Sequence, residues 1–140
     1  MGLVEKAERQ SRARAIIGYL LATTLLASAV LAIHGHSEGA ERLAPWFVMI
    51  GLTALNLTAL PFRWSRCGPV SRLMNDETTR DHRRSSLAAG FWAMLAAAAA
   101  TVIVGSLVPL DTISAGRVVI TAGLMAALIA FSTLELRASR

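Results

Sequence analysis

The chain has 140 residues, of which 54% are hydrophobic, and a mean hydropathy of +0.53. This composition excludes most soluble globular domains, and the single cysteine, Cys67, excludes an internal disulfide and a thiol-pair redox centre. The net charge of +5 and the pI near 11.0 suit a nucleic-acid-binding domain, but the arginines stand between long apolar runs, which favours a membrane protein without direct nucleic-acid contact.

Four apolar runs are each long enough to cross about 30 Å of hydrocarbon as a helix. They occupy residues 15–33, 44–62, 87–108 and 113–134 of a single transmembrane domain, residues 1–140. Pro45 suits the first turn of the second helix, and Pro109 suits the end of the third. The short segment Leu110–Thr112 would turn the chain directly into the fourth helix. The sequence therefore predicts an all-α integral membrane four-helix bundle made of two antiparallel transmembrane hairpins.

The first run also resembles a secretory signal, with a basic start and the sequence Ala-Ser-Ala at Ala27–Ala29. Cleavage after residue 29 is one interpretation. Because the apolar run continues to Ile33, an uncleaved helix is favoured. Both interpretations keep the loop 63–86 on the same side of the membrane.

The distribution of basic residues predicts the orientation of the helices. Twelve of the 14 arginines and lysines lie in the N-terminal segment, the loop 63–86 and the C-terminal tail, and only Arg42 and Arg117 lie on the other side. By the positive-inside rule, both termini and this loop face the cytoplasm of a bacterial inner membrane. Arg117 lies within the first turns of the fourth helix, and we expect it to extend outward to the interface.

Charge is concentrated in the segment NDETTRDHRRSS, residues 75–86. Asn75 suits a helix N-cap, and Asp76 and Glu77 would lie in the first turn, where the helix dipole favours anions. No helix breaker follows before Gly90, so the third helix is expected to begin well before its apolar run. Asp81 and Arg84 have the spacing of a helical ion pair.

Two interpretations of this segment stay open. One is a topology anchor with a well-capped helix start. The other is a docking surface for a cytoplasmic protein, because an anchor needs only arginine, whereas mixed charge offers a pattern that a partner can recognise. The candidate partner-binding residues are Asp76, Glu77, Arg80, Asp81, Arg83 and Arg84.

The sequence contains no HExxH, GxSxG or P-loop motif, which predicts a protein that is not an enzyme. His34 and His36 form an HxH pair beside Glu38 and Glu41, but such a pair in a loop is a weak metal signal. We therefore predict no metal and no cofactor.

Two alternative functions stay open. A small dimeric transporter or flippase would depend on polar groups within the spans, such as Tyr19 or Asn56. Asn56 also suits a hydrogen bond between helices. An accessory subunit of a larger membrane complex, or a homodimer, would instead use the small residues of the last two helices, such as Ala89, Ala93 and Ala97.

The stretch LMNDETTRDHRRSSLAAGFWAML, Leu73–Leu95, resembles a group of small multi-pass membrane proteins of bacteria and archaea. In that group an Asp-Glu-x-x-Arg loop leads into an Ala/Gly-rich helix with an aromatic pair, here Phe91 and Trp92. The group has no assigned enzymatic activity, and its members are often encoded beside helix-turn-helix regulators. The resemblance implies a membrane protein that binds or sequesters a transcription regulator.

Overall fold

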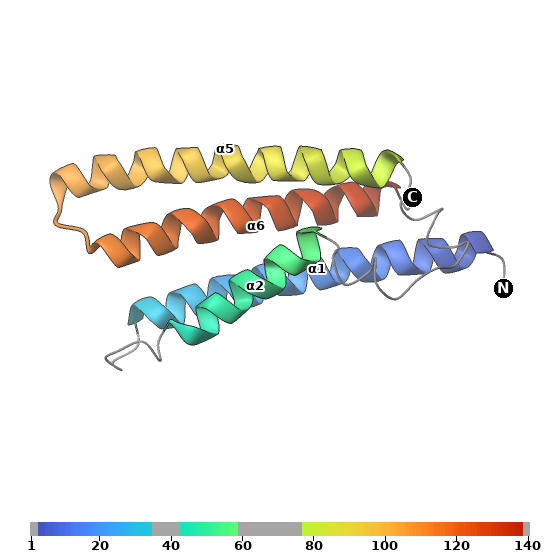
Figure 1. Ribbon diagram of the computed structural model, residues 1–140, viewed down its shortest axis with the longest axis horizontal. Helices are drawn as coiled ribbons and strands as arrows, with labels where there is room; N and C mark the ends of the chain where they lie inside the picture. The colour runs from blue at the N-terminus through green and yellow to red at the C-terminus, as the bar shows by residue number, and fades with distance from the viewer. Residues whose placement is uncertain (1–2, 35–42, 59–76, 139–140) are drawn as a thin grey trace.

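The computed structural model describes residues 3–34, 43–58 and 77–138, with side chains over 12–31, 43–58 and 80–137. This part of the chain contains four helices and no strand. The helices are α1 (Leu3–His34), α2 (Ala44–Thr58), α5 (Glu77–Leu107) and α6 (Thr112–Ala138) (Figure 1). The predicted all-α class is confirmed.

Three of these helices are long and apolar enough to cross a membrane, over Arg12–Leu31, Arg80–Leu107 and Thr112–Arg137. The helix α2 is shorter: its 15 residues extend about 22 Å at 1.5 Å per residue, against about 30 Å of hydrocarbon. The predicted second span, residues 44–62, is helical as far as Thr58, and residues 59–62 lie outside the described part. The described part of the chain thus contains three helices of membrane-crossing length and one shorter helix where four spans were predicted.

The helix α5 begins at Glu77, well before its apolar run. The prediction of an early helix start is therefore confirmed, although Asn75, its expected N-cap, lies outside the described residues. A helix of 31 residues is about 46 Å long, so its first turns extend beyond the length needed to cross the hydrocarbon. These turns contain the charged segment.

A short turn connects α5 to α6, as the sequence predicted. Pro109 lies just past the end of α5, and Asp111 is the N-cap of α6. The Asp111 carboxylate accepts hydrogen bonds from the Ser114 backbone N–H (3.0 Å) and the Ser114 hydroxyl (3.1 Å), and the Asp111 carbonyl accepts from the Ala115 N–H (3.0 Å). The backbone bond from Ser114, followed by the hydroxyl bond, lowers the pKa of the Asp111 carboxyl.

The helix α6 contacts all three other helices (Figure 1). Both α5 and α1 run antiparallel to it and pack along it, while α2 packs on α1 and touches α6. The start of α1, the start of α5 and the end of α6 therefore lie at one end of the molecule, which we call the charged end (Figure 1). The α5–α6 turn and the start of α2 lie at the opposite end, which we call the turn end.

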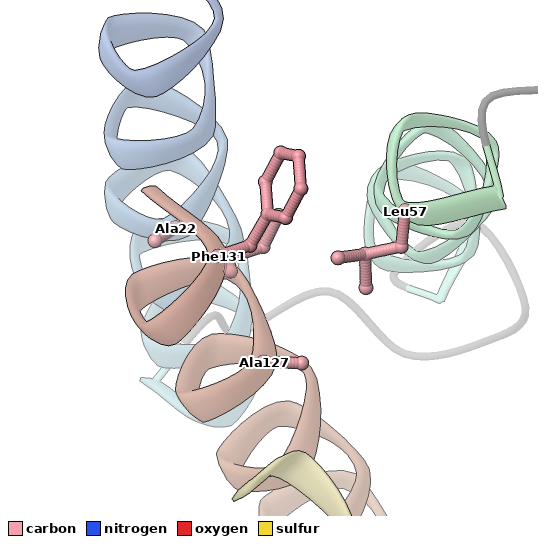
Figure 2. Close-up of a cluster of buried hydrophobic side chains, with 5 residues drawn as sticks. Ala22, Leu57, Ala127 and Phe131 are labelled. Carbon is pink, nitrogen blue, oxygen red and sulfur yellow. The ribbon is translucent and has the colours of Figure 1, made fainter. Parts of the chain in front are cut away.

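The core lies between α1, α2 and α6. Figure 2 shows Ala22 of α1, Leu57 of α2, and Ala127 and Phe131 of α6, which belong to one buried apolar cluster. A second cluster nearer the turn end contains Leu25, Ala29 and Trp46. Burial of apolar side chains is what fixes α2 against its neighbours.

Small residues let the helices approach closely. A methyl group at Gly18 of α1 would collide with the Ser132 hydroxyl of α6, so only glycine fits there without a shift. The buried residues Gly90 of α5, and Gly123 and Ala127 of α6, form the corresponding contact between α5 and α6. Small residues of α5 and α6 therefore lie in the interface between these two helices.

The opposite side of α5 is apolar and exposed. Its exposed large side chains include Leu87, Phe91, Trp92, Leu95, Val102 and Ile103. In a membrane-spanning helix such a surface faces lipid, because lipid tails leave no hydrophobic penalty for exposing it. The helix α5 packs chiefly on α6 and leaves this side without a protein neighbour in the described part of the chain.

Candidate functional site

The start of α5 separates the predicted partner-binding residues into two faces. Arg80, Asp81 and Arg84 are exposed. Arg83 is half-buried and turns toward α6. Glu77 is the first residue of α5, but its side chain, like the whole of Asp76, lies outside what the structure describes.

The exposed face is free of internal partners in the described part of the chain. Arg80, Asp81 and Arg84 form no hydrogen bond or ion pair there. The predicted ion pair between Asp81 and Arg84 is therefore wrong. Exposed pairs at this spacing contribute only about 0.3–0.5 kcal/mol, too little to hold two long side chains in one geometry.

The inner face places Arg83 in a cluster of charges drawn from three helices. Arg83 interacts electrostatically with Arg14 of α1 and Glu135 of α6. Its guanidinium carbon lies 6.0 Å from the centre of the Phe131 ring, a cation–π distance. The Ser86 hydroxyl, one turn further along α5, is completely buried and donates to the Arg83 carbonyl (2.9 Å).

The Arg14–Arg83–Glu135 cluster contains two cations and one buried carboxylate. Glu135 is 5% exposed and lies in the last turns of α6, whose C-terminal end carries the negative pole of the helix dipole. Two cations thus face one carboxylate and one negative helix end. The cluster brings charged side chains of α1, α5 and α6 together at the charged end. Glu135 is not among the residues predicted from the sequence, although an acidic residue at the end of an apolar run is a visible signal.

A second polar contact lies near the turn end. Arg117 of α6 is only 6% exposed, and its guanidinium carbon lies 5.7 Å from the centre of the Trp46 ring of α2. The expectation that Arg117 extends outward to the interface is wrong, because Trp46 covers it. The Trp46 indole N–H also donates to the Thr121 hydroxyl of α6 (3.1 Å), which holds the ring in place over the guanidinium.

Polar groups deeper in the helices are mostly bonded to one another or to their own helix. The Tyr19 hydroxyl of α1 hydrogen-bonds the Thr133 hydroxyl of α6 (2.9 Å), and Thr133 donates to the Ile129 carbonyl (2.7 Å). Asn56 of α2 is half-buried. Tyr19 therefore has a packing role in this structure, and a transport role for Tyr19 or Asn56 stays a prediction.

The HxH pair, a weak metal signal in the sequence, lies outside the described side chains. The side chain of His34 and the whole of His36 lie outside the described part. Among the side chains that the structure describes, no group of three histidine, cysteine or acidic residues could hold a metal ion. Comparison of the chain with protein-family models, with curated proteins and with solved structures gave no match.

Proposed function

We propose that this protein is a non-enzymatic membrane protein whose charged end binds a soluble protein. The binding surface is the exposed face of the first turns of α5, formed by Arg80, Asp81 and Arg84, with Asp76 and Glu77 at its start. The observation that carries the proposal is that these three side chains are exposed and form no ion pair with another described side chain, on a helix packed against α6. Exposed charges of both signs in a defined pattern favour one complementary partner over others.

The proposed partner is a cytoplasmic helix-turn-helix transcription regulator. The resemblance carried by Leu73–Leu95 supports this class of partner, and the basic residues at the charged end support a cytoplasmic location. The membrane protein would then hold the regulator at the bacterial inner membrane and would itself make no contact with nucleic acid.

Site-specific photo-crosslinking in native membranes tests the surface directly. A crosslinker in place of Arg84 is expected to capture a soluble protein, which mass spectrometry identifies. The matched position is Ile103, which is 62% exposed on the apolar side of the same helix and is expected to capture lipid only. Capture of lipid alone at both positions would contradict the proposal.

Charge reversal then tests specificity with purified components. The double variant Arg80→Glu, Arg84→Glu is expected to weaken binding of the identified partner by roughly tenfold or more, because complementary charges become repulsive. The control is Arg12→Glu, an exposed arginine of α1 outside the proposed surface. An equal loss of partner affinity in the double variant and in Arg12→Glu would indicate nonspecific attraction to net charge.

A second function, an accessory subunit of a larger complex or a homodimer, is favoured by the free side of α5. Ala89, Ala96 and Ala100 are exposed there, whereas Ala93 and Ala97 are half-buried. Replacing Ala96 by Leu is expected to release the subunit from its complex without changing its own melting temperature. Replacing Ala93 by Leu is the matched change on a half-buried position, and it is expected to lower the melting temperature instead.

A further inference from the structure

We infer that Arg117, Trp46 and Thr121 form a binding site for a phosphate group where α2 meets α6. The buried Nε atom of Arg117 has no hydrogen-bond acceptor, and the side chain forms no ion pair in the part of the chain that the structure describes. Its close contact is the face of the Trp46 ring. Buried polar groups in native proteins nearly always have a partner, and a buried charge is strongly unfavourable without one.

Among the described residues, the groups around Arg117 favour an anion. The starts of α2 and α6 both lie at the turn end (Figure 1), and each contributes the positive pole of a helix dipole. Asp111 interacts electrostatically with Arg117, but it is exposed and its carboxylate is hydrogen-bonded to Ser114. The Arg14–Arg83–Glu135 cluster, by contrast, has both a buried carboxylate and a negative helix end. Within the described part of the chain, the arginine at the turn end is therefore the one with no buried carboxylate and no negative helix end beside it.

The donors around Arg117 suit the oxygens of a phosphate. Thr121 is one helical turn beyond Arg117 on the same face and is 5% exposed. Its oxygen accepts the Trp46 N–H, so its own O–H is available to donate to a bound anion. The planar guanidinium offers its N–H groups as a fork that matches two phosphate oxygens at once.

The position along α6 gives access to a ligand at the membrane surface. Arg117 is five residues past Thr112, about 7.5 Å along the helix axis, which is close to the depth of lipid headgroups. The neighbouring Gly116 is exposed, and a methyl group there would meet no atom within 4 Å. Two ligands offer a phosphate group that suits this site: the phosphodiester of a phospholipid and inorganic phosphate.

The fluorescence of Trp46 reports binding at this site. The full-length protein carrying Trp64→Phe and Trp92→Phe, purified without lipid in a phosphate-free detergent buffer, retains Trp46 alone. We expect its emission to change on titration with inorganic phosphate, with short-chain phosphatidylglycerol, or with both. Sodium chloride at equal ionic strength and a chain-matched monoacylglycerol are expected to leave the emission unchanged. A response to inorganic phosphate assigns a free anion, and a response to phosphatidylglycerol alone assigns a lipid headgroup.

Variants separate the site from general charge effects. Arg117→Gln is expected to weaken binding by roughly 10- to 100-fold, the loss typical of charge-assisted hydrogen bonds, and Arg117→Lys by less, because it keeps the charge without the fork. Arg12→Gln, which removes one exposed arginine, is expected to leave the affinity unchanged. The inference is overturned if the Trp46 emission of the Trp64→Phe, Trp92→Phe protein changes with neither inorganic phosphate nor phosphatidylglycerol. So would a loss of stability in Glu38→Gln or Glu41→Gln as large as that in Arg117→Gln, because the counter-charge would then be internal.

Discussion

Gly90 of α5 and Gly123 of α6 bring the backbones of two helices into direct contact. A Cβ atom on Gly90 would lie 2.8 Å from the Gly123 carbonyl oxygen and 2.8 Å from the Cβ atom of Ala127. A Cβ atom on Gly123 would in turn lie 3.0 Å from the Cβ atom of Met94. A residue larger than glycine at position 90 or 123 therefore requires the two helices to move apart.

The first prediction concerns this contact. Gly90→Ala is expected to lower the free energy of unfolding by about 1–3 kcal/mol, because the carbonyl oxygen in its path cannot move without moving α6. The measurement is reversible unfolding in mixed detergent and dodecyl sulfate micelles, followed by circular dichroism. The matched change is Gly51→Ala in α2, where an added methyl group meets nothing within 4 Å and is expected to stabilise by up to about 1 kcal/mol. Equal effects of the two changes would contradict the packing of α5 on α6.

The second prediction concerns the indole of Trp46. Trp46→Phe removes the hydrogen bond to Thr121 and weakens the contact with Arg117, so a loss of about 1–2 kcal/mol in the free energy of unfolding is expected. Trp92→Phe is the same chemical change at a side chain that is 68% exposed, and it is expected to cost less than about 0.5 kcal/mol. Thermal unfolding of both variants in one detergent distinguishes them. Identical melting temperatures would show that α2 does not depend on this bond.

The third prediction concerns the charge balance around Glu135. Glu135→Gln leaves Arg14 and Arg83 facing each other without a carboxylate, and on the order of 3 kcal/mol of stability is expected to be lost. Adding Arg83→Gln to the same protein is expected to restore part of the loss, because one of the two uncompensated cations is removed. Arg84→Gln, at the exposed neighbour, serves as the control for stability. If the double variant were less stable than Glu135→Gln alone, the cluster would not be a charge-balanced unit.

The fourth prediction concerns pH and the N-cap of α6. Hydrogen bonds from Ser114 lower the pKa of the Asp111 carboxyl below its ordinary value of 3.8. A depressed pKa stabilises the fold above the unfolded-state value, and this contribution is lost as the pH falls through the folded-state value. Asp111→Asn keeps an N-cap acceptor but cannot ionise. The melting temperature of the parent protein is therefore expected to approach that of Asp111→Asn as the pH falls below about 4. A constant difference across that range would contradict the role of the ionised cap.

Apolar length and helix signals made much of the fold predictable. Each long apolar run has no way to satisfy its backbone in lipid except as a helix, so the all-α class followed from hydropathy. The early start of α5 followed from the absence of a breaker between Asn75 and Gly90. The turn into α6 followed from Pro109, which cannot continue the hydrogen-bond ladder.

The packing and the candidate sites were less predictable. Because the apolar runs have few polar residues to mark an inner face, the sequence did not show that α6 would be the helix touching all others. The sequence predicts that Arg117 extends outward, because it lies near the end of an apolar run. Its burial depends instead on Trp46, which lies on a different helix. The sequence predicts Arg83 as one of six charged residues on a binding surface. Its half-buried position beside Arg14 and Glu135 depends on neighbouring helices, which the sequence pattern of α5 does not reveal.

The central position of α6 has a consequence for how the protein forms. Synthesis proceeds from the N-terminus, so α1 and α5 both leave the ribosome before α6, the helix on which they pack. The close contacts at Gly18 and Gly90 both involve atoms of α6, so they form only after α6 has been synthesised. Assembly is thus delayed until the chain beyond Thr112 is made, and a nascent chain stalled before that point would present its small-residue surfaces to chaperones and membrane proteases.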